Sequence, residues 1–126
     1  MSSSRRVFLG LAVAALALVV ARSSASAAMH LRLAKSEPAK DAVVAAPTQL
    51  KLWFSLKPAM SITTVKLTSS ADVAIKLGKP THGGDVKLPV EVAIEEPLAP
   101  GKYTVSWKTA SSDMHPMTGD FTFTVK

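Results

Sequence analysis

Apolar and polar residues alternate along most of the chain after its first 30 residues. Successive side chains of a β-strand point to opposite faces, so an apolar residue at every second position predicts a strand with one buried face. The clearest runs close the chain, at Tyr103–Trp107 and Phe121–Val125. The other runs with this period are residues 31–33, 50–54, 65–67, 73–77 and 86–94. No apolar pattern of helical period extends over three turns in this region, which predicts an all-β fold.

Proline, glycine and serine punctuate these runs, as expected for turns. Pro89 interrupts the run 86–94 and has no backbone N–H, so that strand is expected to lie at a sheet edge or to be broken there. The segment Leu98–Tyr103 resembles the corner of an Ig-like sandwich, where a tyrosine hydroxyl donates back to the backbone. The spacing of the runs predicts an antiparallel sandwich, or a small Greek-key barrel, of about seven strands.

The first 28 residues have a different character. Adjacent arginines at positions 5 and 6 precede an apolar run from Val7 to about Ala21, and small residues follow up to Ala28. This order is typical of a bacterial export signal, and the arginine pair resembles the Tat type. The apolar run is shorter than the roughly 20 residues of a spanning helix. We expect residues 1–28 to be a cleaved Tat-type signal and residues 29–126 to form one periplasmic domain without a membrane span.

Net charge and cysteine content limit the kinds of partner and metal ligand that the chain can have. The chain has 15 Lys and Arg against 9 Asp and Glu, and three of its arginines would leave with the signal. The mature excess is then 12 − 9 = 3 positive charges, and the lysines are scattered among acids, which argues against a nucleic-acid partner. Cysteine is absent. A soft metal would therefore need methionine, histidine or carboxylate ligands.

The candidate chemistry lies between the last two runs. Asp113 and His115 stand two residues apart, and Pro116 disfavours a helical conformation for His115. In extended backbone the two side chains point to the same side. If His30 begins the mature chain, its α-amine, with a pKa of about 7.7–8.0, and its ring can chelate one ion. These nitrogens, His115 and the oxygen of Asp113 would suit Cu(II), which prefers tetragonal nitrogen and oxygen ligands.

Each of these residues also has a purely structural interpretation. Asp113 can be a turn residue that hydrogen-bonds its own backbone, and His115 a solvated loop histidine. His82 is expected at a loop tip rather than on a metal. Met114 and Met117 can be gap-filling apolar residues. Two potential ligands two residues apart are weak evidence for a metal site on their own.

Four segments add a family resemblance. They are His30–Leu33 with Ser36–Ala39, Ala46–Pro47 leading to Leu50–Ser55, Leu98–Trp107, and Ser111–Gly119 running into Phe121–Val125. In this order, behind an export signal, they resemble the CopC (PcoC) family of periplasmic copper-binding proteins. The resemblance implies a cupredoxin-like or Ig-like β-sandwich, without catalytic activity, that binds one Cu(II) through an N-terminal histidine, an aspartate and a second histidine. Those roles fall on His30, Asp113 and His115.

The resemblance also implies a role. The protein is expected to be a Cu(II) carrier or buffer for copper homeostasis or resistance that hands copper to a CopD-type inner-membrane protein. The second, methionine-rich Cu(I) site of some members is not expected, because residues 68–84 contain no methionine. Leu56 stands where the family usually has an acid near the metal. If Met29 is retained, its amine, the His30 amide nitrogen and the His30 ring would bind instead, and the sulfur of Met29 would favour Cu(I).

Two other function classes stay open. A histidine-brace copper site, formed by an α-amine, His30 and His115, can activate oxygen in a mono-oxygenase-like enzyme. A metal-free Ig-like interaction module is the other alternative. Turnover with a reductant would identify the enzyme, and the absence of stabilisation by copper would identify the module.

Overall fold

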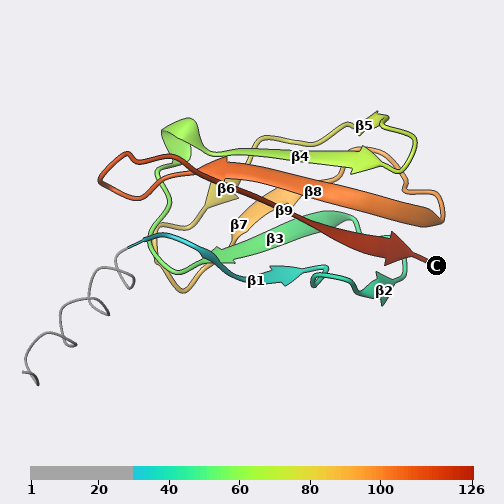
Figure 1. Cartoon of the computed structure of the whole chain (residues 1–126), viewed down its shortest axis with the longest axis horizontal. Helices are drawn as coiled ribbons and strands as arrows, with labels where there is room; N and C mark the ends of the chain where they lie inside the picture. Colours follow the sequence, from blue (N-terminus) through green and yellow to red (C-terminus); the bar gives the residue numbers. More distant parts are fainter. Residues whose placement is uncertain (1–29) are drawn as a thin grey trace, which may run out of the picture. The chain divides into compact units, whose positions relative to one another are not determined.

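Two β-sheets make up residues 30–126, the part of the chain that the computed structural model describes. The predicted export signal, residues 1–28, and Met29 lie outside the described residues. One sheet has the strand order β1 (Leu33–Glu37), β3 (Gln49–Phe54), β7 (Val90–Ala93) and β6 (Thr81–His82). The other has the order β2 (Val43–Val44), β9 (Met117–Val125), β8 (Gly101–Thr109), β4 (Thr64–Ser69) and β5 (Ala74–Ile75) (Figure 1). A 3-10 helix, η1 (Met60–Ile62), precedes β4.

The predicted all-β sandwich is confirmed, with more strands than expected. Residues 30–126 hold nine strands instead of about seven, and β2, β5 and β6 are only two residues long. β5 falls within the predicted run 73–77, of which only Ala74–Ile75 pairs with β4. β2 and β6 were not predicted, because a two-residue strand is too short to produce an alternating pattern. Neighbouring strands are antiparallel except β2 and β9, which are parallel. No helix among the described residues is long and apolar enough to cross a membrane.

The run 86–94 is broken at Pro89, as expected. Only Val90–Ala93 forms a strand, and Val86 and Leu88 before it are exposed. β7 is nevertheless not an edge strand, because it pairs with β3 on one side and with β6 on the other. The pairing with β6 starts at Val90, so the missing N–H of Pro89 falls just outside the ladder.

Alternation on β8 and β9 places one face of each strand in the core. The buried apolar residues of the strands are Leu50, Leu52, Phe54, Leu67, Val90, Val92, Tyr103, Val105, Trp107, Phe121, Phe123 and Val125. The rings of Phe54 and Trp107, one from each sheet, pack edge to face with their centroids 5.2 Å apart. The Tyr103 hydroxyl donates to the carbonyl of Ala99 at 2.7 Å, which confirms the predicted sandwich corner. These contacts anchor the long β8–β9 hairpin in the core, and this hairpin carries the candidate ligands.

Candidate metal centre

The loop of residues 110–116 joins β8 to β9 and is anchored on both sides. The hairpin pairs without interruption up to Thr109 and Met117, which face each other where the loop begins and ends. From the side, the backbone N–H of Ala59 donates to the carbonyl of Ala110 at 2.7 Å. The hydroxyls of Thr63 and Thr109 share a buried hydrogen bond of 2.8 Å. The base of the loop is thus fixed to the segment around η1.

Within the loop, a turn brings Asp113 and His115 together. The N–H of Met114 donates to the carbonyl of Ser111 at 3.0 Å. Met114 has a φ of 61°, in the left-handed region that residues other than glycine seldom adopt. After this reversal the N–H of His115 donates to Oδ1 of Asp113 at 3.1 Å. The turn role considered for Asp113 is therefore present, and it also holds the carboxylate beside the imidazole.

The carboxylate of Asp113 takes part in three hydrogen bonds. Oδ1 accepts from the Ser111 hydroxyl at 2.8 Å and from the His115 N–H, and Oδ2 lies 3.2 Å from Nδ1 of His115. The bond from Ser111 is the largest cause of a pKa of Asp113 below its ordinary value of 3.8, followed by the bond from the His115 backbone. Asp113 is thus fixed in position and remains ionised in mild acid.

The imidazole of His115 is oriented but accessible. Its side chain is 82% exposed, while that of Asp113 is 48% exposed. When Nδ1–H donates to Asp113, the lone pair resides on Nε2, which is then free to bind a metal. Metal-binding histidines commonly donate their other ring N–H to a carboxylate in this way. The pair therefore offers one preoriented nitrogen ligand with an adjacent carboxylate.

The third predicted ligand, His30, is exposed and directly precedes Leu31, which is 2% exposed. Nowhere in residues 30–126 are three or more His, Asp or Glu side chains gathered as a metal site. The structure thus brings together Asp113 and His115, and the set of three with His30 stays a prediction.

His82 has a structural role. It ends β6 rather than occupying a loop tip, and Nε2 lies 3.1 Å from the carbonyl of Leu88. Its Nδ1 accepts the N–H of Gly84 at 3.1 Å. Both ring nitrogens are therefore engaged within its own hairpin.

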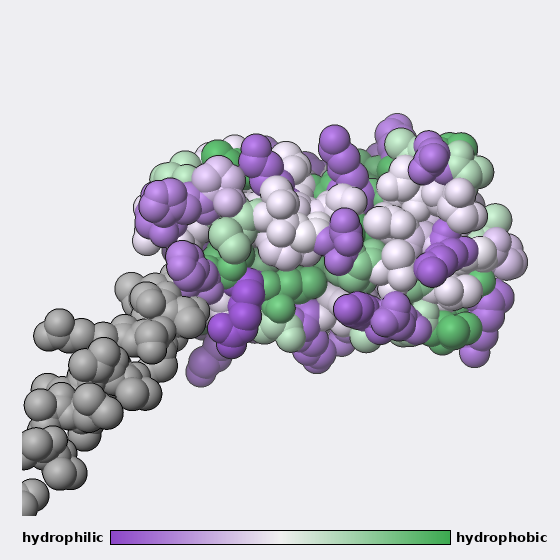
Figure 2. Space-filling view, viewed as in Figure 1, coloured by the Kyte–Doolittle hydropathy of each residue, from purple (hydrophilic) through white to green (hydrophobic). Residues whose placement is uncertain are grey.

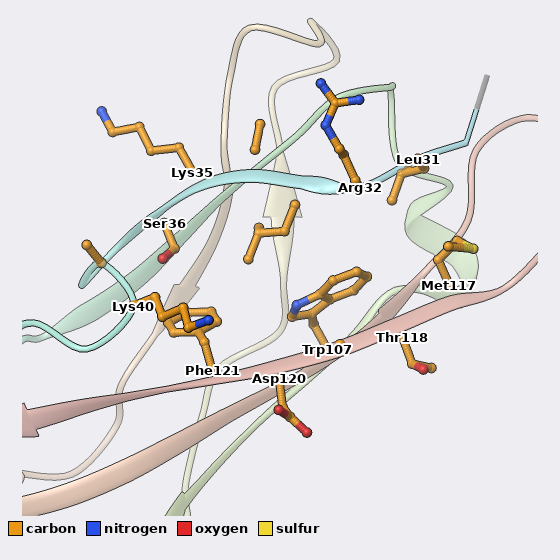
Figure 3. A pocket seen from close by; sticks show the side chains of 14 residues that line it. Leu31, Arg32, Lys35, Ser36, Lys40, Trp107, Met117, Thr118, Asp120 and Phe121 are labelled. Atoms are coloured by element: carbon orange, nitrogen blue, oxygen red, sulfur yellow. The ribbon is translucent and has the colours of Figure 1, made fainter. Parts of the chain in front are cut away.

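The methionines of this region divide by burial. Met117 packs against the core as expected, whereas Met114 is 50% exposed and fills no gap. Figure 3 shows Met117 beside Leu31 and Trp107 in a pocket of about 720 Å³. Neither this pocket nor Ser111 was predicted from the sequence. The only signal for Ser111 was its position two residues before Asp113, at the same spacing that separates Asp113 from His115.

Comparison with known proteins identifies the family. The CopC domain matches residues 33–126. Copper resistance protein C of Escherichia coli is 40% identical over 108 residues, which are 80% of this chain and 85% of the relative. Copper resistance protein C of Pseudomonas syringae pv. tomato is 37% identical over 110 residues, 82% of this chain and 86% of the relative.

A solved structure agrees in fold. The crystal structure of PcoC, a methionine-rich copper resistance protein from Escherichia coli, matches with a TM-score of 0.69 and 36% identity. The match covers 77% of this chain and 99% of PcoC. These relatives are named for copper resistance and not for a reaction. A family match over nearly all the described residues, with relatives 37% and 40% identical, establishes that the chain belongs to the CopC family.

Proposed function

We propose that the protein is a periplasmic copper carrier or buffer that serves copper homeostasis or resistance and holds one Cu(II) per chain. The observation that carries the proposal is the exposed Asp113–His115 pair, held in place by Ser111, in a chain whose relatives are named copper resistance proteins. Copper is the cargo, so the protein acts by affinity and exchange. Residues 1–28 would direct its export as a Tat-type signal.

In this proposal Cu(II) is bound by Nε2 of His115, a carboxylate oxygen of Asp113 and the nitrogens of His30. Imidazole and carboxylate ligands in a tetragonal arrangement are those that Cu(II) prefers. The hydrogen bonds to Asp113 support its role, because a carboxylate held ionised needs no proton release when the metal binds.

The inclusion of His30 is supported by the residue that follows it. Leu31 is buried and lines the same pocket as Met117, which comes two residues after His115. The chain therefore enters the sandwich beside β9, the strand that follows the loop of residues 110–116, termed the metal loop below. If cleavage leaves Met29 in place, its amine, the His30 amide nitrogen and the His30 ring provide the nitrogens. Cleavage before His30 would provide the His30 amine and ring.

The exposure of His115 favours transfer of a bound copper ion to another protein. An imidazole that is 82% exposed leaves a bound ion accessible to ligands of a second protein. We propose a CopD-type inner-membrane protein as this acceptor.

Replacement of His115 by alanine tests the site. The purified protein is titrated with Cu(II) in a calorimeter, and the metal content is read by native mass spectrometry. His115→Ala should lose most Cu(II) affinity and keep the stability of the copper-free fold, because a surface substitution usually changes stability by less than about 0.5 kcal/mol. His82→Ala is the matched control, since its ring bonds only within its own hairpin, and it should bind copper like the wild type.

A thermal measurement separates copper binding from the alternative of a metal-free module. Free Cu(II) at a hundredfold excess over Kd should stabilise the wild type by about 2.7 kcal/mol. Wild-type affinity in His115→Ala, or no stabilisation of the wild type by copper, would refute the proposed site. The intact mass of the exported protein identifies its first residue and the copper stoichiometry together.

A further inference from the structure

Strand β9 has an unpaired outer edge over its first half. On that side β2 pairs only with Thr124 and Val125, and the N–H of Asp41 donates to the carbonyl of Thr122 at 2.7 Å. Backbone groups of alternate residues point the same way in a strand, so those of Thr118 and Asp120 point outward like those of Thr122 and Thr124. Within residues 30–126 they find no backbone partner on that side.

A groove lies along this edge. It is the pocket of about 720 Å³ between β9 and β1, the edge strand of the other sheet. Figure 3 shows Leu31, Trp107, Met117 and Phe121 around its interior. Figure 2 shows a green, hydrophobic stretch on this face between β1 and β9, bordered by hydrophilic residues. Apolar surface next to unpaired backbone donors and acceptors is the combination that an added β-strand covers.

The charges around the groove favour an acidic occupant. Arg32 and Lys40 both line it, and neither forms an ion pair with another described residue. Lys35 also lines it, but its amine is already 3.7 Å from Glu37. The single carboxylate of the lining belongs to Asp120, whose side chain projects away from the pocket in Figure 3.

We propose that this groove binds an acidic polypeptide segment in extended conformation. The segment adds as a strand to the edge at Thr118 and Asp120, lays apolar side chains over Trp107 and Met117, and places its carboxylates near Arg32 and Lys40. Met117 lies two residues from His115, so a segment docked here belongs to a protein that reaches the metal loop. That this protein receives copper rests on the proposed function, whereas the docking itself does not.

The test uses a defined probe and no copper. An octapeptide of alternating glutamate and valine, blocked at both ends, is titrated into the ¹⁵N-labelled purified protein and followed by NMR. The amide signals of Thr118 and Asp120 should shift, and their hydrogen exchange should slow at saturation. A peptide of the same length that alternates lysine and valine should bind more weakly. A glutamate–valine peptide with N-methylated valines, which cannot donate those hydrogen bonds, should also bind more weakly.

Charge reversal supplies the matched variants. Arg32→Glu combined with Lys40→Glu should weaken binding of the acidic peptide about tenfold, because two attractive rim contacts become repulsive. Lys102→Glu is the control, since Lys102 is exposed on β8 and does not line the groove. It should leave the affinity within about twofold, the range expected for a distant screened charge.

Three results would overturn the proposal. The first is equal binding of the acidic and basic peptides, or none at millimolar concentration. The second is a set of shifts that maps to the β5 or β6 edges instead of β9. The third is protection of Thr118 and Asp120 that grows with protein concentration in the absence of peptide, which would assign the groove to a second copy of the chain. His115→Ala should keep peptide binding, so a failure of the copper site and a failure of the groove are distinguishable.

Discussion

Replacement of Gly119 by alanine tests how firmly Trp107 is held over β9, the strand that follows the metal loop. An ideal Cβ at position 119 would lie 2.4 Å from Cζ2 and 2.7 Å from Cε2 of the indole, distances that real Cβ atoms essentially never show. Trp107 is 8% exposed and packs at 5.2 Å against Phe54. The ring therefore cannot yield to the new methyl group unless its neighbours repack.

The expected loss follows from two opposing terms. Alanine gains about 0.5–1 kcal/mol over glycine in a strand because the unfolded chain loses less entropy. Overpacking a core costs about 1–3 kcal/mol, and a rigid buried indole places this site in the upper half of that range. Gly119→Ala should therefore lower the free energy of unfolding by about 1–2.5 kcal/mol, which lowers Tm by about 4–8 °C per kcal/mol in a domain of this size.

The assay is urea denaturation followed by far-UV circular dichroism, extended to a double-mutant cycle. Trp107→Phe removes the clashing atoms, so Gly119→Ala should cost about 1 kcal/mol less in that background than in the wild type. Gly83→Ala is the control, because its Cβ would meet only the exposed side chain of Leu88, at 2.6 Å from Cδ1. It should be close to neutral. Wild-type stability in Gly119→Ala, or additive costs in the cycle, would refute this reasoning.

Three further predictions concern the hydrogen bonds of individual side chains. Ser111→Ala should raise the pKa of Asp113 toward 3.8, so the stability that the ionised carboxylate contributes is lost at a higher pH than in the wild type when the solution is acidified. A ¹³C NMR titration measures this pKa, and an unchanged value would contradict the prediction. Tyr103→Phe leaves the Ala99 carbonyl without its donor and should lower the free energy of unfolding, measured by urea denaturation, by about 0.5–1.5 kcal/mol. An unchanged free energy of unfolding would contradict this and show that water replaces the bond. His82→Ala should speed hydrogen exchange in residues 83–88, and equal rates would show that the ring does not hold this loop.

The sandwich was predictable from the sequence because each long strand has one solvent-exposed face and one buried face. Tyr103 and Phe123 lie on such strands, and their buried positions follow from period two alone. The short strands β2 and β6 depend on tertiary pairing of two residues each, which leaves no local pattern, whereas β5 is the paired part of the predicted run 73–77. The dependence of strands on tertiary pairing also explains why the predicted strand 86–94 is longer than the observed β7, Val90–Ala93. Val86 and Leu88 alternate correctly, but no neighbouring strand reaches them.

The candidate site was predictable in part for a similar reason. The proximity of Asp113 and His115 is local, but a turn with Met114 in the left-handed region brings them together instead of the extended backbone that was expected. The bond from Ser111 to Asp113 is also local, but it depends on the turn that the Met114 N–H closes on the Ser111 carbonyl, and the spacing of two residues does not by itself indicate that turn. The groove beside β9 depends on where β1 lies, more than 80 residues earlier in the chain, and no local pattern reports that placement.

The exposed imidazole of His115 has a consequence for exchange kinetics. An ion bound at a ring that is 82% exposed can gain an incoming ligand before it loses an outgoing one. Substitution would then be associative, and its rate would increase with the concentration of the competing ligand. Release would not wait for the sandwich to open, so a protein of high thermal stability could still give up its metal quickly.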